Sequence, residues 1–454
     1  MCVKTVEKRR KNSFPFCILL KRNNNKRTKG EAIMSITQFT PAIQTKLWQY
    51  AHSFKDIFTK PEHKFIHQML FGILKGGNVQ LNTISRSLQE KLSLKKVSLR
   101  LGAHLDKKNL WHKITESTLK AQKHRLKDCR FIILDLSDIQ KEYAKKMPGL
   151  AVVHDGSKDS LGLGYWQCNI TAVSEDGVIL IPLYSELYSH SEEVTSQNMK
   201  IIEALDLVMN YARKDAVIVI DRGADRNVLY DSFLHSGYPF IIRQNGKRHL
   251  LHSGNKLSFK DISRSVKLKW TFKAERIKHN KVQQLLYKGG ATKVQLKENG
   301  PILWLVVSKE KKRGYTWYLV DLPECKTAKD AVETVVKGYG LRWKIEEVHR
   351  QIKDDYQLES ICLQRYEALK SMNSLLWMAA SFLYTRLEPL VMDILFEPQL
   401  ALINRRKMKD LLRFIYYKLA FAIRRILSLA QVRYGTNIVE INSGQLTLPF
   451  LASI

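Results

Sequence analysis

Two runs of apolar residues that each end in an aspartate constrain the fold of this chain most strongly. Phe131-Ile-Ile-Leu leads to Asp135, and Ala216-Val-Ile-Val-Ile leads to Asp221. Uninterrupted apolar runs of this length are typical of buried strands. Further strands are predicted at 165–173, 178–187 and 239–243, and helices at 196–212 and 224–235. The order β-β-β-α-β-α-β predicts an α/β fold whose sheet is flanked by helices.

The rest of the chain changes character at several points. Three- and four-residue apolar spacing before residue 128 and after about 360 predicts helices, and period-two alternation in 244–325 predicts an inserted antiparallel sheet of its own. The first 33 residues are rich in Lys, Arg and Asn. This composition fits either a disordered basic arm or a start codon assigned too early, with Met34 as the true start. We divide the chain into an arm or early start (1–35), a helical domain (36–128), the first part of the core (129–243), the β-strand insertion (244–325), the second part of the core (326–365) and a helical C-terminal domain (366–454).

A possible helix-turn-helix pair lies in the first helical domain. Asn82 to Lys91 and Lys95 to Leu105 would be its two helices. The second would carry Lys95, Lys96 and Arg100 outward, as a helix in a DNA groove does. A plain helical bundle fits nearly as well.

The charge of the chain predicts a polyanionic partner. Its 75 Lys and Arg against 43 Asp and Glu give a formal charge of +32, which favours nucleic acid. A membrane is not expected, because the apolar run Leu375 to Tyr384 is too short to span one and is followed by Arg386 and Glu388.

Six scattered cysteines form no Cys-x-x-Cys pair or zinc-like spacing. Together with the lack of a recognisable secretory signal, this predicts reduced thiols and a cytoplasmic protein.

A charged stripe is predicted on a helix near residue 346. Tyr339, Arg342, Glu346 and Lys353 are spaced three, four and seven residues apart, so at about 100° per residue they share one side of a helix. Leu341, Ile345, Val348 and Ile352 form a separate apolar face. A carboxylate between cations suits a metal-dependent reaction on a phosphodiester. A solvated helix face is the alternative.

Two neighbours of Glu346 are not expected to act in the site. Glu347 points about 100° away on a helix. His349 is one turn further on, and we interpret it as an ordinary polar helix residue rather than a general base.

Three acids from two strands and one helix can converge over one edge of the sheet. Asp135, Asp221 and Glu346 would offer only oxygen ligands, which favour Mg²⁺ or Mn²⁺. Two such ions can serve an in-line phosphoryl displacement. Taken singly, each aspartate could equally be a turn or helix-cap residue.

These motifs resemble those of bacterial insertion-sequence transposases of the cut-and-paste type, which have an RNase H-like DDE core. Tyr339-x2-Arg342-x3-Glu346-x6-Lys353 matches their signature in full, and Asp221-Arg222-Gly-Ala-Asp225 resembles their second-acid run. The first-acid strand departs from the pattern, because Leu136 stands where the family usually has Thr or Ser directly after the Asp. Asp138 therefore remains an alternative to Asp135 as the first acid of the motif.

The resemblance implies an RNase H-like mixed sheet and roles for particular residues. Asp135, Asp221 and Glu346 would be catalytic and hold two metal ions, while Tyr339, Arg342 and Lys353 would contact DNA phosphates. Arg222 would be a further phosphate contact, unless it forms a salt bridge to Asp225 or Glu346. Trp317, from the insertion, would stack on a flipped base near a hairpin end, with packing inside the insertion as the competing explanation.

The implied function is a DNA transposase of the bacterial cytoplasm and nucleoid. It would bind terminal inverted repeats through residues 36–128, cut both strands and join the 3′-ends to target DNA, as a homodimer that pairs through its C-terminal helices. A catalytically inactive DNA-binding regulator is one alternative, although such a protein has no reason to keep all three acids. An RNase H-like nuclease that cleaves without joining strands is the other.

Overall fold

The structure is a computed structural model, and it describes residues 36–141, 144, 146–155, 160–192, 196–278, 281–310, 314–387, 390–391, 394, 415–429 and 434. The predicted basic arm and the basic segment around 405–409 lie outside these residues. The described chain forms two compact units. One contains residues 115–350, and the other joins 33–114 to 351–454.

The first unit is a mixed α/β structure, as predicted. It contains β1 (Cys129–Gln140), β2 (Ala151–Asp155), β3 (Ser160–Ser174), β4 (Leu180–Tyr188), α7 (Gln197–Met209), β5 (Val217–Ile220), the 3-10 turn η1 (Arg222–Ala224), α8 (Asn227–Ser236), β6 (Phe240–Arg243), β7 (His249–His252), β8 (Asn255–Ser258), α9 (Phe259–Ser265), β9 (Trp270–Lys278), β10 (Lys281–Val294), β11 (Leu303–Glu310), β12 (Gly314–Asp321), α10 (Ala328–Gly340) and most of α11 (Trp343–Asp354). β2 was not predicted from the sequence, and neither was the helix α9, which lies in the segment predicted to be an antiparallel sheet.

One ten-stranded sheet organises this unit. Its order is β2-β3-β1-β5-β6-β12-β11-β10-β9, with β4 paired to β3. The central pairs β1–β5 and β5–β6 are parallel and the other pairs are antiparallel. This mixed sheet agrees with an RNase H-like core.

The strands of the insertion are antiparallel, as expected, but the prediction of a separate sheet is wrong. β12 pairs with β6, with Leu319 opposite Ile242, so β9 to β12 extend the core sheet. The exposed hydrogen-bonding edge of β6 would otherwise lack a partner, which explains the extension. Within the described residues, a second sheet is formed by the short hairpin β7–β8 alone.

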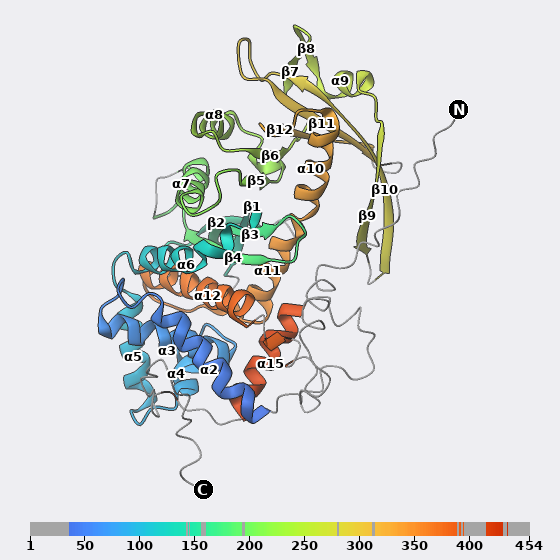
Figure 1. Cartoon of the computed structure of the whole chain (residues 1–454). Helices are drawn as coiled ribbons and strands as arrows, with labels where there is room; N and C mark the ends of the chain where they lie inside the picture. Colours follow the sequence, from blue (N-terminus) through green and yellow to red (C-terminus); the bar gives the residue numbers. More distant parts are fainter. Residues whose placement is uncertain are drawn as a thin grey trace, which may run out of the picture. The chain divides into compact units, whose positions relative to one another are not determined.

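Helices cover both faces of the core sheet (Figure 1). Side chains from β1, β3 and β5 pack with those of α7 and α8 in one hydrophobic core. On the other face α10 approaches closely at Gly338, where an added Cβ would lie 2.6 Å from the Phe131 ring and 3.0 Å from Ile241. The missing side chain therefore lets the helix that carries Tyr339 lie directly on the sheet.

The second unit is helical, as predicted. Its described helices are α2 (Ile36–His52), α3 (Lys60–Gly76), α4 (Leu81–Leu88), α5 (Leu94–Leu105), the start of α6 (Leu110–Leu126), the 3-10 turn η2 (Leu358–Ser360), α12 (Tyr366–Arg386) and α15 (Ile415–Leu429). A capping box of Thr59 and Glu62 starts α3, and Gly77 ends it with a φ of 58°. α12 is buried along almost its whole length. None of the described helices combines the length and the apolar character that crossing a membrane requires.

The two helices of the expected helix-turn-helix pair are α4 and α5. Lys95 and Lys96 are exposed on α5, as expected. The expectation for Arg100 is wrong, because its guanidinium lies 2.7 Å from the Glu90 carboxylate and also bonds to Gln68. Since Glu90 neutralises that charge, a DNA contact by α5 would depend on the two lysines.

Candidate active site

Strand register brings the first two acids together. The parallel ladder between β1 and β5 ends at Leu134 opposite Ile220, so Asp135 and Asp221 follow as neighbours at the same edge. The expectation that Asp135 ends its strand is wrong, because β1 continues to Gln140 in its pairing with β3. What ends here, at Leu134, is the parallel pairing of β1 with β5.

Asp135 and Asp138, the two candidates for the first acid, lie on opposite faces of β1. Side chains alternate between the two faces of a strand, so Asp138, three residues on, points to the opposite face. The register therefore favours Asp135 as the partner of Asp221.

The charged stripe is carried by two helices, so the prediction of one helix is wrong. α10 ends at Gly340 and α11 begins at Trp343, with Leu341 and Arg342 in a turn between them. The Arg342 backbone N–H bonds to the Tyr339 carbonyl at 3.1 Å, three residues back instead of four, so the chain turns more tightly here than in an α-helix. Gly338 and Gly340 have poor helix propensity, which explains the break.

Despite the break between α10 and α11, Tyr339 and Arg342 of the stripe contact the three acidic side chains. The Tyr339 hydroxyl donates a hydrogen bond of 2.8 Å to Asp221 Oδ1. Arg342 forms an ion pair with Glu346, and its Nη1 lies 3.8 Å from Asp135 Oδ1. Arg342 thus bridges a carboxylate on the sheet and one on α11.

The two aspartates differ in protonation. Burial raises the pKa of Asp135 to about 7; Arg342 opposes this, and the nearby Glu346 and Asp221 add to it. Burial also acts to raise the pKa of Asp221, but the Arg222 backbone N–H and the Tyr339 hydroxyl outweigh it and hold that pKa below the ordinary value. Asp221 is therefore ionised at neutral pH, whereas Asp135 needs a cation nearby to stay fully ionised.

The donor set fits a hard divalent ion. All three side chains are carboxylates; Arg342 contacts Asp135 and Glu346, and the Tyr339 hydroxyl bonds to Asp221. Among the described residues, no three acidic, histidine or cysteine side chains lie close enough to hold an ion as they stand. Because the Arg342 guanidinium bridges Asp135 and Glu346, it must move before the two carboxylates can share an ion.

Other residues of α11 lie as follows. Glu347 pairs with Lys344 at 3.6 Å. His349, set aside in the sequence analysis, has its Nδ1 3.9 Å from Asp135 Oδ2. Lys353, seven residues after Glu346, has its ammonium 3.5 Å from Glu359.

Sequence reasoning missed Arg243. Its guanidinium lies 3.7 Å from Asp221 Oδ1. Ile242 is opposite Ile220 in the parallel pairing of β5 and β6. Arg243, the last residue of β6, therefore lies beside Asp221, which directly follows β5. The rule that located the two aspartates, applied to the end of the next parallel strand, would have found it.

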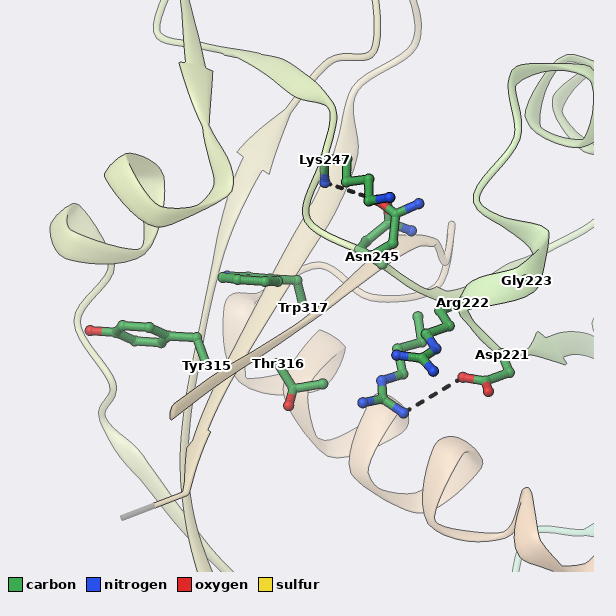
Figure 2. A pocket seen from close by; sticks show the side chains of 10 residues that line it. Asp221, Arg222, Gly223, Asn245, Lys247, Tyr315, Thr316 and Trp317 are labelled. Carbon is green, nitrogen blue, oxygen red and sulfur yellow. Dashed lines mark hydrogen bonds and ion pairs between the residues drawn. The ribbon is translucent and has the colours of Figure 1, made fainter. Parts of the chain in front are cut away.

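A pocket of about 670 Å³ opens beside Asp221 (Figure 2). It is lined by Asp221, Arg222, Gly223, Arg243, Gln244, Asn245, Lys247, Tyr315, Thr316 and Trp317. Arg222 is exposed here, and the salt bridges considered for it are made by other arginines. Asp225 pairs with Arg248 at 2.6 Å, and Glu346 pairs with Arg342. The pocket therefore joins the carboxylate of Asp221 to cationic and aromatic side chains.

Trp317 both packs and lines this pocket. Its Nε1 donates to Ser263 Oγ at 2.7 Å, and its ring lies 5.4 Å from that of Phe259. Gly246, with a φ of +79°, leaves room for the ring, since a Cβ there would come within 2.6 Å of it. The indole is thus held in a fixed orientation at the pocket wall (Figure 2).

Asp225 anchors the loop that forms another part of the wall. Its side chain is 1% exposed, and it accepts hydrogen bonds from the Asn245 backbone N–H at 3.1 Å and from Arg248 Nε at 2.7 Å. Arg248 also lies over the Tyr230 ring, 4.9 Å from its centroid. The second aspartate of the Asp-Arg-Gly-Ala-Asp run therefore positions the loop 244–248.

Residues 180–382 match a family described as the transposase DDE domain. This segment resembles a transposase DDE domain. The matched segment contains Asp221 and Glu346 and begins after Asp135. A search of curated proteins found no match to the chain.

The match confirms the resemblance to DDE transposases and the expected fold class. DDE transposases are enzymes that act on DNA and generally use divalent metal ions, and the match supports an enzyme of this family. The individual site residues and the Tyr-Arg-Glu-Lys signature stay predictions.

Proposed function

We propose that the chain is a DNA transposase that binds terminal inverted repeats, cleaves both strands through a hairpin, and joins the freed 3′-ends to target DNA. Support comes mainly from one observation. Arg342, one residue of the signature, bridges Asp135 and Glu346, while Tyr339, another, bonds to Asp221. Residues far apart in the sequence thus meet in one acidic site.

In this proposal Asp135, Asp221 and Glu346 hold two Mg²⁺ or Mn²⁺ ions. When bound, such a pair of ions activates the attacking oxygen and stabilises the leaving oxygen of an in-line displacement. Tyr339 fixes the orientation of Asp221 through its hydroxyl. Arg342 releases the two carboxylates and turns to a phosphate of the DNA, which gives its charge a new partner.

The pocket residues serve the DNA in the same proposal. Arg222 and Arg243 line the pocket beside Asp221, where phosphates of the cleaved strand would lie. Lys353 is proposed as a further phosphate contact, which requires it to leave Glu359. Trp317, held by Ser263, stacks on a flipped base.

Recognition of ends and pairing of chains would belong to the helical unit. We propose that α5 presents Lys95 and Lys96 to the terminal repeats. A homodimer would hold two ends together in the bacterial nucleoid. α12 is buried within its own unit, so on the described residues the dimer surface would fall on α15, where Phe421 is 51% exposed.

The products formed from DNA that carries the terminal repeats test the proposal. With Mg²⁺, the chain is expected to give hairpin ends and strands joined to target DNA, both visible on denaturing gels. An absence of cleavage would instead indicate a DNA-binding regulator, and nicks at any sequence without joining would indicate a nuclease.

A further inference from the structure

One face of the insertion carries a row of lysines to which the proposed function assigns no role. α10 packs against β9, β10 and β11 on the opposite face, where Val332 lies near Gly289. We give the name lysine face to the exposed side chains of Lys273, Leu286, Lys288 and Lys309 together with the partly buried Tyr315.

Strand register places these side chains together. Lys273 is opposite Leu286, Lys288 is opposite Lys309, and Lys309 is opposite Tyr315. Directly opposite residues of antiparallel strands project from the same face, and neighbouring strands lie about 4.8 Å apart. The row therefore crosses four strands, β12, β11, β10 and β9, over about 15 Å.

The charges of the lysine face are not neutralised within the described part of the chain. Lys273, Lys288 and Lys309 are all exposed, and none forms an ion pair with a described residue. The Lys309 ammonium lies over the Tyr315 ring, 4.8 Å from its centroid. Leu286, between the lysines, is 53% exposed.

The lysine face is continuous with the pocket beside Asp221. Tyr315 belongs to both, and its ring lies nearly parallel to that of Trp317, at 20° and 6.5 Å between centroids (Figure 2). A chain of phosphates that enters the pocket therefore meets Lys309, Lys288 and Lys273 in turn as it leaves across the sheet.

We propose that the lysine face binds the backbone of an unpaired DNA strand that runs out of the pocket across β12, β11, β10 and β9. A sheet face with lysines beside aromatic rings has the chemistry of single-strand platforms, in which cations follow the backbone and rings stack on bases. This inference rests on the proposed function, because it takes the pocket to be the place where the DNA is opened.

The test compares two variants of the full chain that lose equal charge. One is K273Q/K288Q/K309Q, and its matched control is K123Q/K127Q/K214Q, which removes three exposed lysines elsewhere in the same unit. Each is titrated against a blunt duplex and against the same duplex with a single-stranded extension, over a range of salt concentrations, after thermal unfolding has shown that both variants are folded.

For the extended duplex, the slope of log affinity against log salt should be smaller by about 2 in the lysine-face variant than in its control, because each contact to a single strand contributes about 0.7. For the blunt duplex the two variants should agree. A photo-cross-linking residue in place of Leu286 should label the extension and not the duplex.

Equal slopes for the two variants on the extended duplex would overturn the inference, as would an equal loss by the lysine-face variant on the blunt duplex. Either result leaves the hairpin and joined products of the unsubstituted chain as a separate test, so failure of this inference is distinguishable from failure of the proposed function.

Discussion

Replacing Glu346 with glutamine is expected to reduce strand cleavage by at least about a thousandfold, because ion-mediated charge stabilisation contributes several kcal/mol to such a transition state. The amide keeps the size of the side chain but removes the negative charge that would hold an ion. Affinity for DNA should change little, since phosphate contacts by Lys and Arg dominate it. Cleavage rates on end DNA and equilibrium binding measure the two effects separately.

Glu347→Gln is the matched control for this variant. Glu347 is adjacent in sequence, but it pairs with Lys344 and its side chain is 13% exposed. Its replacement removes the same charge from the same helix without touching Asp135 or Asp221. Near-normal cleavage is expected, and strand cleavage that survives in Glu346→Gln would remove Glu346 from the catalytic site.

Replacing Arg342 with glutamine is expected to act in opposite directions on ion binding and on catalysis. Without DNA, Mn²⁺ should bind about tenfold more tightly, because the guanidinium that bridges Asp135 and Glu346 repels an incoming cation. Cleavage should fall by about a hundredfold or more, because a cation facing the reacting phosphate is lost. Calorimetric Mn²⁺ titration and single-turnover cleavage report the two quantities.

Lys344→Gln provides the comparison for Arg342. It also removes one positive charge from α11, but Lys344 pairs with Glu347. Its Mn²⁺ affinity should stay close to that of the unsubstituted chain. If Arg342→Gln bound Mn²⁺ no better than Lys344→Gln, the guanidinium would order the carboxylates rather than stand in for a cation.

Local patterns in the sequence predicted most of the core. The apolar runs before Asp135 and Asp221 are long enough to identify buried strands, and the order of the elements predicted an α/β fold. The mixed sheet was implied only by the resemblance to DDE transposases. The alternation in the insertion predicted antiparallel strands but not their attachment to β6, because period-two patterning shows which side chains share a face and not which edge a strand joins.

The details of the site were harder to predict. The stripe from Tyr339 to Lys353 keeps helical spacing across Gly340, so the break between α10 and α11 leaves no mark in the periodicity. Arg243 and the lysine face depend on strand register, which pairs residues distant in sequence. The contact of Arg342 with Asp135 depends on both the break and the register.

The number of Mn²⁺ ions bound to the chain on already cleaved end DNA tests the central claim most directly. Electron paramagnetic resonance of free Mn²⁺ during a titration gives this number. The shared acidic site predicts two tightly bound ions per chain, and the loss of at least one in each of Asp135→Asn, Asp221→Asn and Glu346→Gln. Tight binding that is unchanged in all three variants, or absent from the unsubstituted chain, would contradict it.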